Sequence, residues 1–157
     1  MNSFELLENE ACEEGVDIVG YDFRSERIRG LYCNGTVAIS NDIDTITEKT
    51  TVLAEELGHY YTTTGNILDQ TDVSSRKQER HARVWAYDKL IGLSGIIRGS
   101  EAGCQSRYEL AEFLGITEDF LQDALYCYES KYGTYIRTGE YMIIFTPTLS
   151  VIKLLST

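Results

Sequence analysis

The stretch Val52-Leu-Ala-Glu-Glu-Leu-Gly-His-Tyr-Tyr61 decides how the rest of this chain is interpreted. Read as a helix, it places Glu55 and His59 one turn apart, with Glu56 on the same side. Two carboxylates and an imidazole therefore converge on one part of the helix surface. The simplest interpretation is a solvated acidic face with a single histidine, because Glu is a good helix former and charged runs are usually exposed.

A second interpretation is catalytic. In the H-E-x-x-H pattern of zinc proteases, histidines at i and i+4 bind Zn²⁺, and the Glu between them is the general base that activates the bound water. In this chain Glu55 occupies the position of the first histidine, Glu56 that of the catalytic Glu, and His59 that of the second histidine. The pattern is therefore complete except for one ligand.

Composition limits the classes of protein that this chain can belong to. Its 157 residues are 43% hydrophobic and include 11 tyrosines, which argues against disorder and predicts one compact domain with a C-terminal extension. No apolar run approaches the roughly 20 residues that span a bilayer. The acidic N-terminus lacks the regions of a signal peptide, so we expect a cytosolic protein. The formal charge of −11 opposes binding to nucleic acid, whose phosphates need Lys and Arg.

The cysteines give no sign of a metal cluster or a redox site. Four of them are scattered along the chain without a C-x-x-C pair, at positions 12, 33, 104 and 127. In a reducing compartment they are most simply free thiols.

Turn and capping signals predict the order of the elements. Asn34-Gly35 between two β-prone runs is typical of a hairpin with a type I′ turn, which needs positive φ at both central residues. Thr45 with Glu48, and Ser106 with Glu109, have the form of capping boxes. The predicted elements are a helix from Phe4 to Ala11 stopped by Gly15, an extended segment 16–23, a hairpin 28–40, a helix from Thr45 to about Thr63 ended by Gly65 and Asn66, a loop 65–74, a helix from Ser74 or Ser75 to about Leu90, a Gly- and Ser-rich junction 92–103, helices 106–114 and 117–133, and a hairpin 135–145 ended by Pro147.

The two long helices are expected to pack closely. Gly58 costs about 1 kcal/mol relative to Ala in a helix interior, which is tolerable if another backbone comes close there. In the second long helix Glu79, Ala82 and Ala86 share one face, whose small residues would allow tight packing against the helix that carries Glu55, Glu56 and His59, called here the motif helix. A carboxylate on that face is where a third metal ligand is expected; an ordinary surface Glu is the alternative.

The two short helices that follow residue 103 have the outline of a helix-turn-helix. The second of them, Phe120-Leu-Gln-Asp-Ala-Leu-Tyr-Cys-Tyr-Glu129, is acidic, which argues against a role in reading the major groove of DNA. We interpret this segment as structural or protein-binding.

Two blocks of the chain resemble the ImmA/IrrE family of metallopeptidases, particularly the small versions carried by prophages and integrative elements. The blocks are Leu53-Ala-Glu-Glu-Leu-Gly-His-Tyr-Tyr-Thr-Thr-Thr-Gly-Asn-Ile-Leu68 and Arg76-Lys-Gln-Glu-Arg-His-Ala-Arg-Val-Trp-Ala-Tyr-Asp-Lys-Leu-Ile91. A weaker resemblance in 107–118 extends the similarity over most of 28–145. The resemblance implies a cytosolic zinc protease that cleaves a helix-turn-helix repressor and thereby releases a mobile element or a stress response.

The resemblance also implies roles for individual residues. His59 corresponds to the second histidine ligand, Glu56 to the catalytic Glu, and Glu79 to the acidic third ligand in the E-x-x-A block, here Glu79-Arg-His-Ala. Glu55 departs from the family pattern. A carboxylate can ligate zinc, so the site would become a Glu/His/Glu set, which would also suit Mn²⁺ or another divalent ion. His81 lies two residues from Glu79 and would point elsewhere on a regular helix.

These inferences define an expected fold and two expected functions. We expect an α+β, zincin-like core at 1–92, with a small antiparallel sheet and the motif helix packed on further helices. A helix-turn-helix-like extension with a terminal hairpin follows at 93–157 and packs on the core. The leading function is metal-dependent cleavage of a helix-turn-helix phage or mobile-element repressor, with the substrate paired along the 28–40 hairpin. The alternatives are a purely structural hairpin and a non-catalytic antirepressor that binds the repressor without cleaving it. Neither function needs nucleic acid or a membrane.

Overall fold

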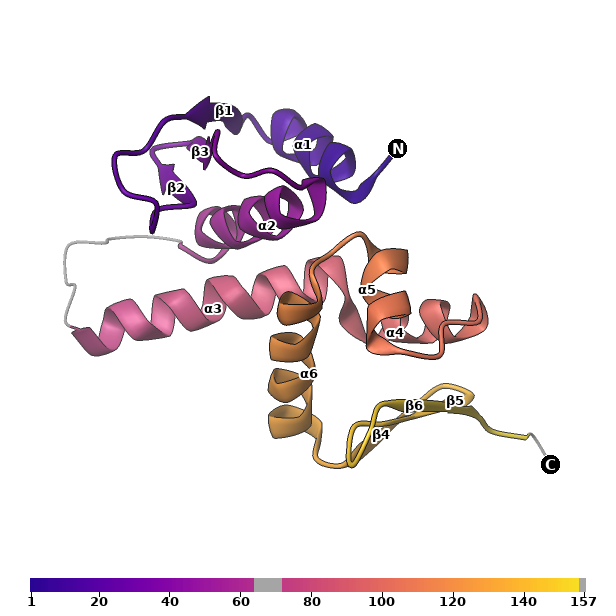
Figure 1. Ribbon diagram of the computed structural model, residues 1–157. Helices are drawn as coiled ribbons and strands as arrows, with labels where there is room; N and C mark the ends of the chain where they lie inside the picture. The colour runs from indigo at the N-terminus through magenta and orange to yellow at the C-terminus, as the bar shows by residue number, and fades with distance from the viewer. Residues whose placement is uncertain (64–71, 156–157) are drawn as a thin grey trace. The chain divides into compact units, whose positions relative to one another are not determined.

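The computed structural model describes residues 1–63 and 72–155, without the side chains of 72–74. The chain divides into two compact units, an N-terminal unit, Met1–Lys89, and a C-terminal unit, Leu90–Thr157 (Figure 1). Each unit contains helices and a small sheet, so the predicted α+β class is confirmed. The predicted division into domains 1–92 and 93–157 stays a prediction.

Helix α1 (Ser3–Glu13) opens the N-terminal unit, where the sequence predicts a short amphipathic helix. Asn2 and Glu5 form a reciprocal capping box, because the Asn2 side chain accepts from the Glu5 backbone N–H and the Glu5 carboxylate accepts from the Asn2 N–H. Leu7 and Ala11 are buried. Gly15 follows with φ +82°, the left-handed conformation that ends a helix.

The sheet of this unit has three strands, β1 (Asp17–Tyr21), β2 (Gly30–Cys33) and β3 (Thr36–Ser40), in the order β1-β3-β2. Strands β2 and β3 form the predicted hairpin, and positive φ at Asn34 and Gly35 confirms the turn. The prediction of an antiparallel sheet is wrong for β1, which pairs with β3 in parallel. After the hairpin turn, β3 runs in the same direction as β1 and lies between β1 and β2. An alternating sequence pattern shows which residues share a face of a strand, but it does not show which strands become neighbours.

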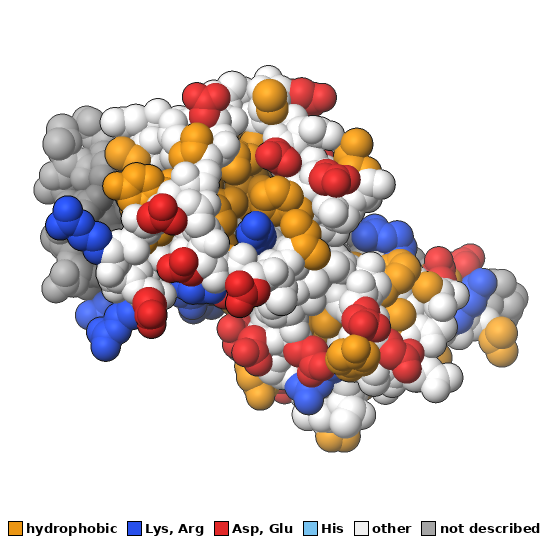
Figure 2. Space-filling model, turned by 45° about the horizontal axis from the view of Figure 1, so that its top comes forward, with side chains coloured by type: hydrophobic (Ala, Val, Ile, Leu, Met, Phe, Trp, Pro, Cys, Tyr) orange, Lys and Arg blue, Asp and Glu red, His pale blue; other side chains and the backbone are white. Residues whose placement is uncertain are grey.

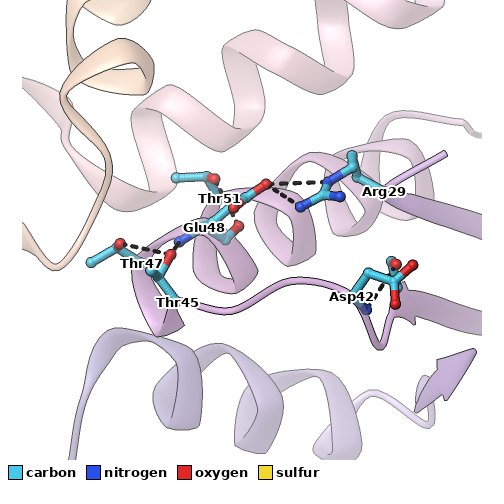
Figure 3. A network of polar contacts seen from close by, with 7 residues as sticks. Arg29, Asp42, Thr45, Thr47, Glu48 and Thr51 are labelled. Atoms are coloured by element: carbon cyan, nitrogen blue, oxygen red, sulfur yellow. Dashed lines mark hydrogen bonds and ion pairs between the residues drawn. The ribbon is translucent and has the colours of Figure 1, made fainter. Parts of the chain in front are cut away.

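The motif helix is α2 (Ile46–Thr62), and it begins where the sequence predicts. The Thr45 hydroxyl accepts from the Glu48 N–H, as in a capping box. The second bond of a capping box, from the Thr45 backbone N–H to the Glu48 carboxylate, is not formed. The Glu48 carboxylate instead accepts from the Arg29 guanidinium, with Nη2 to Oε1 at 2.6 Å (Figure 3). Both side chains are about one-third exposed, so the pair adds little stability by itself. Its effect is positional, because it ties the start of β2 to the first turn of α2.

The core of the N-terminal unit lies between the sheet and α2 (Figure 1). Leu53 and Leu57 are at most 1% exposed, and Val37 and Ile39 of β3 are buried on the sheet face that covers α2. The opposite face of the sheet carries exposed apolar side chains, among them Val19 and Leu31. The alternation of β3 therefore sets which face of the sheet the motif helix occupies.

Helix α3 (Asp72–Leu90) corresponds to the second long predicted helix and begins slightly earlier than Ser74. Ala82 and Ala86 are at most 1% exposed, which agrees with the prediction that small residues form the packed face. Most of the predicted loop 65–74, and the predicted stop at Gly65 and Asn66, lie outside the described residues.

The C-terminal unit begins with helix α4 (Gly92–Glu101), where the sequence predicts a Gly- and Ser-rich junction. This prediction is wrong because the segment is helical and Gly99 serves packing. A Cβ on Gly99 would lie 2.3 Å from Leu110 Cδ1, whereas one on Gly95 would make an ordinary contact of 3.4 Å with Leu114 Cδ2. Both leucines belong to α5 (Arg107–Leu114). Composition alone cannot distinguish a flexible linker from a helix whose glycines admit a neighbour.

The rest of the unit follows the predicted capping signals. Ser106 and Thr117 accept from the backbone N–H groups of Glu109 and Phe120, and Gly115 (φ +72°) ends α5. Helix α6 (Glu118–Tyr132) then ends at Gly133. The predicted hairpin is β4 (Tyr135–Thr138) and β5 (Tyr141–Ile144). A third strand, β6 (Ser150–Lys153), pairs with β5 beyond Pro147, where the sequence analysis ended the sheet.

The surface shown in Figure 2 carries acidic side chains (red) spread among exposed hydrophobic ones (orange). This distribution agrees with the net charge of −11. Within 1–63 and 72–155, no helix combines the length and the apolar character needed to cross a membrane.

Candidate functional site

Helices α2 and α3 cross at Gly58. A Cβ built on Gly58 would lie 2.2 Å from the backbone oxygen of Ala82, so only glycine fits at this point of α2. The close approach that the sequence predicts for Gly58 is thereby confirmed. Because side chains on either side of such a crossing face each other in pairs, the crossing brings the motif residues of α2 against the Glu79 face of α3.

His59 and Glu79 meet at this crossing. The distance from His59 Nε2 to Glu79 Oε1 is 3.3 Å, with the His59 side chain 23% exposed and the Glu79 side chain 60% exposed. The two residues come from different helices and from the two sequence blocks that suggest the family. Two of the predicted metal ligands therefore lie together at the surface of the N-terminal unit.

Glu56 lies beside the edge strand β2. A Cβ on Gly30 would come within 3.0 Å of Glu56 Cγ, so the absence of a side chain at Gly30 makes room for the carboxylate stem. Burial raises the pKa of Glu56, whereas His59 and a hydrogen bond from the Tyr32 backbone N–H act to lower it. Glu56 is thus a half-buried carboxyl group that holds its proton more readily than an exposed one.

Glu55 lies on the same side of α2, and the charge of Arg83 acts on it. Burial raises the pKa of Glu55, and the charge of Arg83 opposes this effect most strongly. The neighbouring carboxylates Glu56 and Glu79 raise its pKa further. On α3, Arg83 follows Glu79 by one turn, as Glu55 precedes His59 by one turn on α2. Arg83 acts on Glu55 through its charge, whereas His59 and Glu79 form an ion pair.

The described side chains do not form a complete ligand cluster. Among them, no group of three or more His, Cys, Asp or Glu side chains is arranged to hold a metal ion. Two predicted ligands, His59 and Glu79, are brought together; the third, Glu55, interacts with them electrostatically. His81, for which the sequence predicts a different direction, has an exposed side chain.

Two contributors to this site are not among the residues predicted from the sequence. Arg83 could have been found from its spacing to Glu79, since a basic residue one turn further along α3 mirrors Glu55 on α2. Tyr32 acts through its backbone N–H and therefore left no signal in the sequence. Its position depends on the hairpin register.

A large cavity lies elsewhere, in the C-terminal unit. It has a volume of about 740 Å³ and is lined by parts of α4, α5, α6 and the segment 145–151, including Arg107, Gln122 and Glu129. None of the predicted site residues lines this cavity. The site in the N-terminal unit is a helix surface beside a strand edge.

No protein-family model and no curated protein matches this chain. Its function has to be inferred from its residues and their geometry.

Proposed function

We propose that this protein is a metal-dependent endopeptidase of the ImmA/IrrE type, with a zincin-like core, which cleaves a helix-turn-helix phage or mobile-element repressor in the bacterial cytoplasm. His59, Glu79 and Glu55 would hold the metal ion, and Glu56 would be the general base. The resemblance of the two sequence blocks supplies the family, and the geometry of the α2–α3 crossing supports the assignment of the residues.

The observation that carries this proposal is the separation of His59 Nε2 from Glu79 Oε1. Two ligand atoms bound to one tetrahedral zinc ion at 2.0–2.1 Å are roughly 3.3–3.4 Å apart. A charge-assisted hydrogen bond between the same groups is shorter, about 2.7–2.9 Å. At 3.3 Å the two atoms are far enough apart to bind one ion between them.

The donor set fits a divalent cation in its chemistry. An imidazole nitrogen and carboxylate oxygens suit Zn²⁺, and the excess of oxygen also suits Mn²⁺. When bound, such an ion would polarise the scissile carbonyl and lower the pKa of a bound water. Glu56 lies close enough to His59 for the charge of His59 to lower its pKa. Burial raises the pKa of Glu56, which suits a group that accepts a proton and then returns it to the leaving amine.

The edge strand β2 supports a peptide substrate. Among the described residues it is one of the two outer strands of its sheet, and it lies against the same side of α2 as Glu56. An extended peptide that pairs with β2 would therefore pass beside the general base.

Metal content tests the proposal directly. Protein purified without chelator and without a metal-binding tag is expected to contain near-stoichiometric Zn²⁺ or Mn²⁺ by mass spectrometry, and His59→Ala is expected to lose it. His81→Ala is the matched control, because it removes an exposed histidine two residues from Glu79 and should leave the metal content unchanged. Absence of metal from the wild type, even after Zn²⁺ or Mn²⁺ is added, would remove the catalytic proposal.

A second candidate function is a non-catalytic antirepressor that binds the repressor without cutting it. The charge of Arg83 near Glu55 favours this candidate, because it gives the unusual carboxylate a role that needs no metal. In that case the charge of Arg83 on Glu55 and the His59–Glu79 ion pair would both favour the packing of α2 on α3.

Substitution Glu55→His separates the two candidates. If the native site is a weakened metal site, restoring the histidine is expected to raise metal affinity and the rate of repressor cleavage by roughly tenfold or more, since it supplies the second imidazole. Glu55→Gln is the control, because it removes the charge without supplying a nitrogen ligand. If Glu55→His leaves metal binding and cleavage at zero and repressor binding intact, the antirepressor interpretation is correct.

A further inference from the structure

Helix α2 presents three side chains along the edge strand β2. Val52, Glu56 and Tyr60 follow one another at intervals of one turn and so lie in one strip. A Cβ on Gly30 would lie 2.7 Å from Val52 Cγ1, and the ring centres of Tyr32 and Tyr60 are 5.8 Å apart. The strip therefore runs in the same direction as β2 and places the Glu56 carboxylate between the aliphatic Val52 and the aromatic Tyr60.

The outer backbone edge of β2 faces this strip. The Ser40 N–H donates to the Arg29 oxygen at 2.8 Å, which makes residues 29 and 40 a hydrogen-bonded pair of the antiparallel ladder. Because such pairs alternate, the backbone groups of Gly30 and Tyr32 point away from β3. The Tyr32 N–H points to Glu56 and is bonded to it, as expected from this geometry. A peptide strand added to β2 would therefore pair with the backbone groups of Gly30 and the backbone oxygen of Tyr32, and would lie over the strip.

Aromatic rings continue from the strip across both helices. The ring centres of Tyr60 and Tyr61 are 4.8 Å apart, and Tyr61 stacks on Trp85 of α3 at 4.8 Å with an interplanar angle of 15°. All three side chains, like that of Tyr32, are half-buried rather than enclosed. Contacting aromatic rings that remain partly exposed provide large apolar contact area at little entropic cost, which is typical of recognition surfaces.

We propose that β2 and the Val52–Glu56–Tyr60 strip bind an extended peptide, and that Tyr32 and Tyr60 select a large apolar or aromatic side chain beside the peptide bond to be cleaved. Val52 provides a smaller aliphatic contact on the other side of Glu56. Acidic side chains are disfavoured at this position because Glu55, Glu56 and Glu79 lie close by. This inference adds a substrate preference to the proposed function and rests on that function for the cleavage step. The preference of the surface for peptides with a large apolar side chain needs no metal.

The test uses short peptides that are capped at both ends and identical except for a central Phe, Leu, Ser or Asp. Binding to the full-length protein is followed by calorimetry and by the fluorescence of Trp85, the single tryptophan of the chain. We expect the Phe and Leu peptides to bind roughly tenfold or more tightly than the Asp peptide, because they bury an apolar side chain. Tyr60→Ala should abolish this preference, and Tyr60→Phe should keep it, since the ring rather than the hydroxyl makes the contact. Tyr108→Ala, an exposed helical tyrosine of the C-terminal unit, should change nothing.

Mass spectrometry of the same peptides after addition of Zn²⁺ separates this inference from the peptidase proposal. Binding with the expected preference but without cleavage would support the recognition surface and contradict the peptidase. Cleavage without preference for the central residue, or a preference that survives Tyr60→Ala, would overturn the recognition surface and leave the peptidase standing. Cleavage next to Phe or Leu, lost in Tyr60→Ala, would support both.

Discussion

Replacing Glu56 by Gln is expected to abolish peptide-bond cleavage and, at the same time, to stabilise the protein near neutral pH. Loss of a positioned general base typically costs 10²- to 10⁴-fold in rate, and Gln has nearly the same shape as Glu. Metal content should stay at the wild-type level, because Glu56 is not among the proposed ligands. Cleavage of the repressor, measured by mass spectrometry with metal-loaded protein, checks the loss of activity.

The expected gain in stability follows from the direction of the pKa shift. Burial raises the pKa of Glu56 above its value of 4.5 in the unfolded chain. The folded protein therefore binds more protons than the unfolded chain in the pH range just above 4.5, and this carboxyl group makes the free energy of unfolding fall as the pH rises through that range. Gln carries no charge and removes the penalty. Urea unfolding at pH 4 and pH 7 should show that the variant gains stability over the wild type at pH 7 but little at pH 4.

Glu8→Gln is a suitable control for both measurements, because Glu8 is an exposed carboxylate on α1 of the same unit. It should leave activity and the pH dependence of stability unchanged. Full activity of Glu56→Gln would mean that another group takes the proton. Loss of activity together with loss of stability at pH 7 would indicate that Glu56 has a structural role instead.

Replacing Gly58 by Ala is expected to destabilise the N-terminal unit by about 1–3 kcal/mol, although Ala is the better helix former by about 1 kcal/mol. The added methyl group would lie 2.2 Å from the Ala82 backbone oxygen, and a backbone atom cannot move aside as a flexible side chain can. The helices would have to separate, which would also part His59 from Glu79. Urea unfolding followed by circular dichroism, together with metal content, measures both effects.

The same substitution at Gly95 provides the comparison. Gly95 is also a helical glycine, but its added Cβ would make an ordinary contact of 3.4 Å with the end of the Leu114 side chain. Gly95→Ala should therefore be neutral or stabilising by up to about 1 kcal/mol. Equal effects at the two positions would show that the α2–α3 crossing is not as close as 2.2 Å implies.

Local signals in the sequence predicted those elements whose ends are determined by their own residues. Asn34-Gly35 requires positive φ, and Thr45, Ser106 and Thr117 each accept from a backbone N–H of the helix that they begin. These interactions span only a few residues, so the sequence pattern contains them completely. The partners of β1 and β6 depend on chain paths over longer distances, and no local pattern encodes them.

The candidate site, too, was predictable where it depends on spacing within one helix, and not where it depends on the packing of two helices. Helical spacing puts Glu55, Glu56 and His59 on one side of α2, and Gly58 indicated a close neighbour. The identity of that neighbour, and the register that sets His59 against Glu79 and brings the charge of Arg83 near Glu55, follow from how two helices cross. Glu48 shows that a local pattern can also predict a bond that does not form. The capping pattern pairs its carboxylate with the Thr45 N–H, but in the structure the carboxylate binds Arg29, which is distant in the sequence.

The glycines of α4 restrict how the C-terminal unit can be shortened or can drift during evolution. An added Cβ on Gly99 would meet the end of the Leu110 side chain at 2.3 Å, whereas Ser94 and Arg98 of the same helix are exposed. Substitutions should therefore be tolerated on the exposed side of α4 and be selected against at Gly99. A truncation within 92–103, where the sequence predicts a junction, would remove the helix against which α5 packs.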